Sequence, residues 1–260
     1  MGFIGRIFGG SDSSRNRNAA DALWHPDQYR GESAVAVTAT QLDHKVASPG
    51  ERRRIYAAWI DFFSSPTPIT VLDLRSRVPQ ELLDSLRGQP QLEALHLKWG
   101  PYRDIGVVGQ LPALATLALG GATALESVEA IRGRDGLIAL TVEQAHRVTD
   151  PSPISTLRNL RDLAYGGYVG SDKPVVLENV RWIEPLKELR SLDLPGTRLL
   201  DADVSPLLEL SSLEELNLPL RRTYRAQVFE FAATSRAFAG LAAKYTAYDE
   251  WSSEMRRESS

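Results

Sequence analysis

The chain has 260 residues, and 43% of them are hydrophobic, which is enough to bury a sizeable core in one or two domains. Its 30 basic residues against 33 acidic ones give a formal charge of −3, which gives no chain-wide attraction to phosphate backbones, so we expect no nucleic-acid partner. The chain contains no cysteine, which excludes disulfides, thiolate metal sites and cysteine nucleophiles.

Residues 1–32 are expected to form a flexible tail, because residues 1 to about 20 are rich in Gly, Ser, Asn and Arg. No apolar run in this region reaches the length of a signal-peptide core or a membrane span, so we expect a cytoplasmic chain with no membrane span. The pairs Phe3-Ile4 and Ile7-Phe8 lie at helical spacing. Contact with a membrane or a partner is therefore the alternative to a fully solvated tail.

Residues 33–68 are predicted to form an N-terminal cap. Val35 and Val37 alternate as in a short strand, and Ser48-Pro49-Gly50-Glu51 is typical of a helix start with proline at the first helical position. Pro66 and Pro68 stop that helix before the next segment. The apolar residues that the helix would bury are Ile55, Trp59, Phe62 and Phe63.

A repeated string dominates the middle of the chain. The pattern Leu-x-x-Leu-x-Leu, with conservative substitutions, occurs seven times, and the middle apolar residues lie 22 to 29 residues apart. The copies are Ile69-Leu72-Leu74, Leu92-Leu95-Leu97, Leu114-Leu117-Leu119, Leu137-Leu140-Val142, Leu160-Leu163-Tyr165, Leu189-Leu192-Leu194 and Leu213-Leu216-Leu218. One supersecondary unit is therefore repeated.

Each repeat combines two periodicities. The central x-Leu-x-Leu-x part alternates with period two, which predicts a short strand with its leucines directed into the core. Other apolar residues lie three apart, as in Val108-Leu111-Leu114, and this spacing suits 3₁₀ turns on the convex side. Since a single copy cannot cover its own apolar face, neighbouring copies must stack into a curved solenoid with a parallel sheet on the inner face.

The segment Val148-Thr149-Asp150-Pro151-Ser152-Pro153-Ile154 through Leu163 resembles the repeat unit of leucine-rich-repeat proteins, in the short-repeat class of bacterial internalins. The resemblance covers about residues 69–220, and we assign seven repeats to 69–222. It implies an α/β leucine-rich-repeat solenoid with a curved parallel sheet on its concave face and helical caps at both ends. It also implies a scaffold that binds proteins, although a shared fold does not define a shared function.

One slot departs from the family pattern. The family places Asn five residues after the middle leucine, where its side chain bonds neighbouring backbone turns. Only Thr197 can bond similarly here, so we expect an irregular solenoid whose turns depend on Gly, Pro and water. The residues in this slot are Arg77, Gly100, Ala122, Ala145, Tyr168, Thr197 and Arg221.

Residues 223–251 are predicted to form a helical C-terminal cap, because a solenoid end exposes apolar core. We expect residues 252–260 to be a loose tail. The apolar residues available to cover the last repeat are Val228, Phe231, Phe238, Leu241, Tyr245 and Trp251.

The outward positions of the predicted strands form columns across the concave face, which we expect to bind a protein or peptide partner. Small residues at its middle, such as Ala118 and Gly120, would admit another backbone, and the face would change from basic to acidic along the solenoid. The alternative for any single member is a solvated strand residue without a special role. The expected partner-binding residues are Asp73, Arg75, His96, Lys98, Trp99, Thr141, Glu143, Asp162, Asp193, Glu215 and Asn217.

A second candidate site is the insertion at residues 166–174, which lengthens one repeat. Insertions of this kind gather on one rim of a solenoid and often bind ligands. Tyr168 is its expected anchor, with Tyr102 as a similar aromatic residue on the rim of the second repeat. An enzyme or small-ligand binder with a pocket near this insertion is therefore the alternative function.

No motif in the chain indicates catalysis, a cofactor or a metal. The histidines His25, His44, His96 and His146 are scattered and form no metal-binding pair, and the glycines of the insertion lack the spacing of a phosphate-binding loop. We therefore expect a monomeric, non-catalytic interaction module without cofactor or metal.

Overall fold

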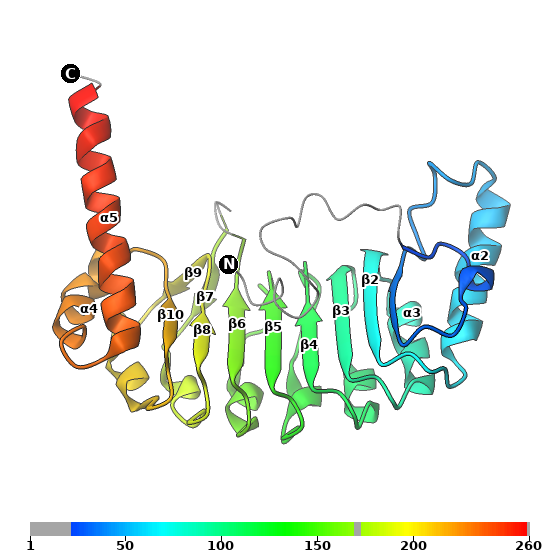
Figure 1. Ribbon diagram of the computed structural model, residues 1–260, viewed down its shortest axis with the longest axis horizontal. Coiled ribbons are helices and arrows are strands. Elements are labelled where there is room, and N and C mark those ends of the chain that lie inside the picture. The colour runs from blue at the N-terminus through cyan, green and yellow to red at the C-terminus, as the bar shows by residue number, and fades with distance from the viewer. Residues whose placement is uncertain (1–21, 169–172, 259–260) are drawn as a thin grey trace.

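A computed structural model describes residues 22–168 and 173–258 of the chain (Figure 1). The predictions for residues 1–20, including the pairs Phe3-Ile4 and Ile7-Phe8, fall outside the described residues, as does the 169–172 part of the insertion. In the described ranges, no helix combines the length and the apolar character needed to cross a membrane.

Among the described residues, eight strands form one parallel sheet that extends from α2 at one end to α4 and α5 at the other (Figure 1). In order, these strands are β1 (Ala34–Val37), β2 (Val71–Arg77), β3 (Ala94–Trp99), β4 (Thr116–Leu119), β5 (Ala139–Glu143), β6 (Asp162–Gly166), β8 (Ser191–Asp193) and β10 (Glu215–Asn217). A second, two-stranded sheet contains β7 (Val175–Leu177) and β9 (Thr197–Leu199).

The helices are α2 (Pro49–Phe63), α3 (Gln80–Ser85), α4 (Arg225–Phe231) and α5 (Arg236–Glu258). Short 3₁₀ turns return the chain between strands at Leu86–Gly88, Gly106–Gln110, Glu129–Ile131, Ser152–Thr156, Arg181–Ile183 and Ser205–Glu209, and two more lie in the caps at Pro26–Gln28 and Arg222–Tyr224. These turns form the convex layer that the three-residue apolar spacing predicted.

The core is a stack of aligned leucines. Leu72 pairs in register with Leu95, and the row continues through Leu117, Leu140, Leu163, Leu192 and Leu216. Every member is buried in one continuous core with the apolar residues of the turns. The predicted leucine-rich-repeat solenoid with a parallel sheet is confirmed.

Backbone hydrogen bonds join adjacent turns where the strands end. The amides of Ala122 and Gln144 donate to the carbonyls of Glu143 and Gly166 at 2.8 and 2.7 Å. Glycine is required where strands end, since a Cβ at Gly120 would lie 2.3 Å from the Lys98 carbonyl oxygen. Thr197 is buried as expected for this slot, and its hydroxyl donates to the Leu194 carbonyl at 2.7 Å.

The N-terminal cap begins earlier than the sequence indicated. Leu23 forms a parallel bridge with Val37, and the carbonyl of Trp24 accepts a hydrogen bond from Trp59 Nε1 at 3.2 Å. The expected tail up to residue 32 is therefore wrong for residues 22–32, because aromatic packing holds them against α2. The α2 helix starts as predicted, with Ser48 Oγ accepting from the Glu51 amide at 3.3 Å.

The C-terminal cap also differs from the prediction. Val228, Phe238, Leu241 and Tyr245 are buried against the last repeat. However, α5 continues to Glu258 and extends past the carboxyl ends of the strands (Figure 1). Trp251 is 54% exposed, so it does not cover the repeat, and residues 252–258 are helical instead of a loose tail.

Candidate functional site

The columns predicted for the concave face are present. In one column Asp73 pairs with His96, and the register continues through Ala118, Thr141, Ala164, Asp193 and Asn217. In the neighbouring column the register runs Val71, Ala94, Thr116, Ala139, Asp162, Ser191 and Glu215. The concave face therefore carries these side chains in straight rows across the sheet.

The N-terminal end of the face contains a bonded cluster. The Asp73 carboxylate lies 2.7 Å from His96 Nδ1 and accepts from Arg75 Nε at 2.8 Å. Burial alone would raise the Asp73 pKa, but the bonds and charges of His96 and Arg75 outweigh burial and lower the pKa. Asp73 is only 8% exposed and bonds to its own neighbours, and its predicted contact with a partner stays a prediction.

At the same end of the face, the side chains of Lys98 and Trp99 are exposed. Lys98 follows His96 by two positions, and the Trp99 side chain is also open to solvent. Because Asp73 neutralises part of the Arg75 charge, this end is less basic than its residue types indicated. Lys98 and Arg77, which pairs in register with Trp99, are exposed cations there.

The middle of the face is built from small residues. Ala118 and Ala139 are buried, and Thr141 is only 2% exposed, so little of its surface is open to a partner and its predicted role stays a prediction. The Glu143 side chain at the end of β5 reaches solvent, but the surrounding protein partly desolvates its carboxyl group and raises its pKa. Small side chains here allow another backbone to approach the sheet.

The C-terminal end forms an acidic half that comprises Asp162, Asp193 and Glu215. Asp193 accepts from Asn217 Nδ2 at 2.7 Å, and Lys244 Nζ of α5 lies 3.0 Å from Asn217 Oδ1. Burial raises the Asp193 pKa, and the Asn217 bond and the Lys244 charge only partly oppose it. A basic partner group would therefore relieve the cost of ionising this carboxyl group.

The two rim tyrosines have different environments. Tyr102 is fully buried and its hydroxyl donates to the Gly120 carbonyl at 2.9 Å, so its predicted role on the rim is wrong. Burial raises the Tyr102 pKa well above its ordinary value. Tyr168 is 60% exposed, beside the part of the insertion that lies outside the described residues.

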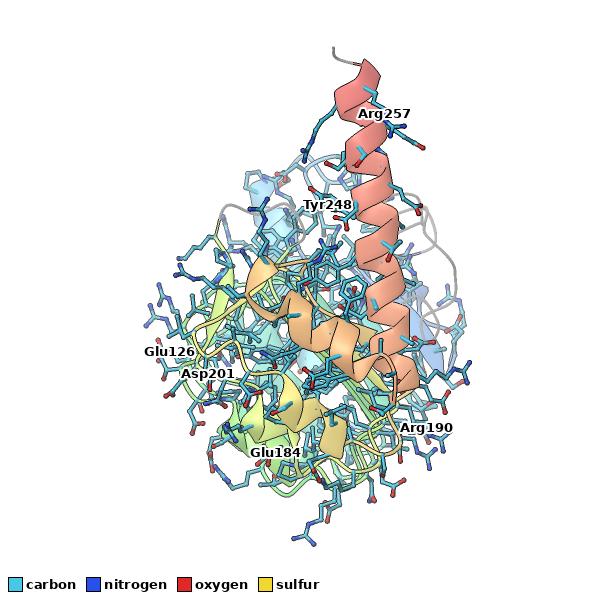
Figure 2. The ribbon with its side chains drawn as sticks, turned by 90° about the vertical axis from the view of Figure 1, so that its left-hand side faces the viewer. Glu126, Glu184, Arg190, Asp201, Tyr248 and Arg257 are labelled. Atoms are coloured by element: carbon cyan, nitrogen blue, oxygen red, sulfur yellow. The ribbon has the colours of Figure 1, made fainter. Side chains whose placement is uncertain are left out.

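Sequence reasoning missed an apolar stripe on α5, which we define as Tyr248, Trp251 and Met255. Figure 2 shows α5 rising beyond the rest of the chain, with Tyr248 partway along it and Arg257 near its end. The three side chains are 52%, 54% and 46% exposed, and the Tyr248 and Trp251 ring centroids lie 5.7 Å apart. Their spacing of three and four was visible in the sequence, but the same spacing describes a packed cap helix.

The apolar stripe is continuous with the concave face. Lys244, Tyr248, Trp251 and Met255 follow each other at helical spacing and so share one side of α5. Lys244 contacts Asn217 of the face. The stripe therefore starts where the acidic half ends.

A cavity of about 340 Å³ lies away from this surface, between residues 39–43 and α2. Its lining includes Arg52 and Tyr56, and none of its lining residues belongs to the 166–174 insertion. Within the described ranges, no group of three His, Asp or Glu side chains is placed to hold a metal ion.

The stacked strands, the buried leucine row and the convex 3₁₀ turns define a leucine-rich-repeat fold. No family model and no curated protein matches the chain. Among solved structures it is similar to internalin C2 of Listeria monocytogenes, with 21% identity, a TM-score of 0.49 and coverage of 58% of this chain and 65% of that one.

Two further structures show a similar likeness. A leucine-rich-repeat protein of Leptospira interrogans has 22% identity and a TM-score of 0.41, over 58% of this chain and 37% of that one. The ectodomain of the Arabidopsis receptor kinase HAESA, solved with a peptide hormone, has 18% identity and a TM-score of 0.40, over 59% of this chain and 25% of that one. In each case the chain covers less than two thirds of the matched structure.

Proposed function

We propose that this chain is a non-catalytic interaction module in the cytoplasm that binds a protein or peptide partner on its concave face. The supporting observation is the alignment of Asp162, Asp193 and Glu215 beside a middle section of small residues. An extended basic segment fits this arrangement, because its backbone can approach the alanines while its cations meet the carboxylates.

The stacked repeats also favour binding without rearrangement. Each strand is fixed by hydrogen bonds to its neighbours, and the side chains below it are buried in one core. A surface that is already ordered loses little conformational entropy when a partner binds. The proposal therefore predicts a preformed site whose affinity depends on charge.

Reversal of three charges tests the proposal. The variant Asp162→Lys, Asp193→Lys and Glu215→Lys should lose a specific partner that the parent chain captures from a lysate of its own organism, identified by mass spectrometry. A matched variant replaces the exposed Asp135, Glu188 and Glu214 by lysine. These residues lie outside the strands of the face, so this variant should still capture the partner. The matched variant should melt at the parent temperature. Because Asp193 is bonded to Asn217, the first variant is compared at a temperature at which circular dichroism shows it folded, and capture by the folded first variant would contradict the proposal.

A further inference from the structure

The acidic half and the apolar stripe favour different types of side chain in a segment that binds them. The acidic half favours cations, whereas Tyr248, Trp251 and Met255 favour apolar side chains. Lys244 joins α5 to β10 of the face, and the stripe lies farther along α5, past the carboxyl ends of the strands, so a covering segment meets the stripe after it has crossed the acidic half. A matching segment must therefore carry cations along its length and an apolar cluster at the end that reaches α5.

Residues 1–21 of this chain have that composition. They contain three arginines, Arg6, Arg15 and Arg17, against two aspartates. The apolar residues of this segment gather near its start, at Phe3, Ile4, Ile7 and Phe8. The order of the two kinds of residue matches the order on the face if the segment runs from the N-terminal cap toward α5.

The length of the segment also fits. Leu23 pairs with Val37 of β1, so the segment joins the described chain at the edge of the sheet opposite α5. At about 4.8 Å per strand spacing, β10 lies about 34 Å from β1, while 21 extended residues reach about 70 Å. Arg15 is seven residues from Ala22 and reaches about 23 Å, so its side chain comes within range of β6, which carries Asp162.

We propose that residues 1–21 bind across the concave face of the same molecule, with Arg15 near the acidic half and Phe3, Ile4, Ile7 and Phe8 against the apolar stripe. The segment then occupies the surface that the proposed function assigns to a partner, and this inference rests on that function for its regulatory meaning. A partner must displace the segment, so affinity is reduced by the fraction of molecules in which the face is covered.

Because the chain has no cysteine, engineered cysteine pairs test this placement directly. The full-length variant Ser11→Cys with Ser191→Cys places one thiol in the segment and one on β8. Its control combines Ser11→Cys with Ser205→Cys, since Ser205 is exposed in a convex turn. Under mild oxidation the first pair should form a disulfide about tenfold faster than the control, because the segment holds the thiols at a high effective concentration.

The outcomes separate the possible occupants of the face. A disulfide rate that does not change on dilution supports binding within one molecule, whereas a rate that rises with protein concentration indicates a second copy and overturns the proposal. Equal rates for both pairs also overturn it. A second pair, Ser14→Cys with Thr116→Cys on β4, keeps the test valid if the Ser191 variant does not fold.

Charge variants distinguish this inference from the proposed function. Arg6→Glu, Arg15→Glu and Arg17→Glu in the full chain should slow the Ser11–Ser191 crosslink severalfold and increase partner capture. Unchanged crosslinking would contradict the role of the arginines. If capture depends on Asp162, Asp193 and Glu215 but the crosslink is absent, the proposed function stands and the inference fails.

Discussion

Lys244 of α5 donates from Nζ to Oδ1 of Asn217 at 3.0 Å, and this bond joins the capping helix to the concave face. Asn217 in turn donates to Asp193 at 2.7 Å, so the helix influences a carboxylate two strands into the solenoid. The cap is therefore part of the binding surface as well as a cover for the last repeat.

Lys244→Met should raise the pKa of Asp193 further above its ordinary value. The Lys244 charge lowers that pKa against the stronger effect of burial, so its removal leaves burial less opposed. Carbon-detected NMR titration of the carboxyl group measures the change. The control Lys187→Met removes a cation from the convex side, where Lys187 contacts Glu209, and should leave the Asp193 titration unchanged.

Asp73→Asn should reduce stability by about 1–3 kcal/mol near neutral pH, because a buried carboxylate loses its charge-assisted bonds to His96 and Arg75. The lowered Asp73 pKa means that the ionised form stabilises the fold above the ordinary value of 3.8, and that this contribution disappears as the pH falls below it.

Urea unfolding of parent and Asp73→Asn at pH 7 and at acidic pH measures this dependence. The difference between the two proteins should be largest at pH 7 and should shrink as Asp73 is protonated. The exposed Glu93 offers a matched control, since Glu93→Gln should change stability little at either pH. A difference that stays constant with pH would contradict the assigned role.

Gly120→Ala should destabilise the solenoid by about 1–3 kcal/mol, because the added Cβ would lie 2.3 Å from the Lys98 carbonyl oxygen and would separate two neighbouring turns. Gly240→Ala makes the same chemical change in α5, where nothing lies within 4 Å, and should stabilise by about 0.5–1 kcal/mol through helix propensity. Thermal unfolding compares the two, and equal effects would refute the close approach.

Trp251→Ala should change stability by no more than about 0.5 kcal/mol, since the side chain is mostly exposed on the projecting part of α5. Phe238→Ala, on the packed part of the same helix, should cost about 3–5 kcal/mol. Chemical denaturation measures both. A loss of several kcal/mol in Trp251→Ala would mean that the residue covers the last repeat after all.

The sequence was sufficient to predict the repeat architecture because the leucine spacing reports burial directly. Leu72 through Leu216 must face inward in register, and the outward columns follow from the alternation of each strand. The spacing does not indicate which outward side chains form hydrogen bonds or ion pairs with one another. The Asp73 cluster depends on side-chain reach between β2 and β3, so its internal bonding could not be predicted from the pattern.

Loop residues and helix ends were less predictable for the same reason. Tyr102 lies outside the repeated string, and its burial depends on a hydrogen bond to Gly120 eighteen residues away. Trp251 and Leu241 share the helical apolar spacing, but Leu241 is buried whereas Trp251 is 54% exposed. A periodic pattern identifies a helix face without giving the length of the surface that the face meets.

The small β7–β9 sheet has a consequence for how this scaffold can vary. Val175 pairs with Thr197 outside the main sheet, while Leu163 of β6 still pairs directly with Leu192 of β8. The insertion precedes β7, and Val175 and Leu177 of β7 are buried in the common core, so the longer repeat leaves the main sheet in register. Sequence can be inserted or exchanged beside Tyr168 while the pitch of the leucine row stays constant, so new contacts can be acquired here without refolding the remainder of the molecule.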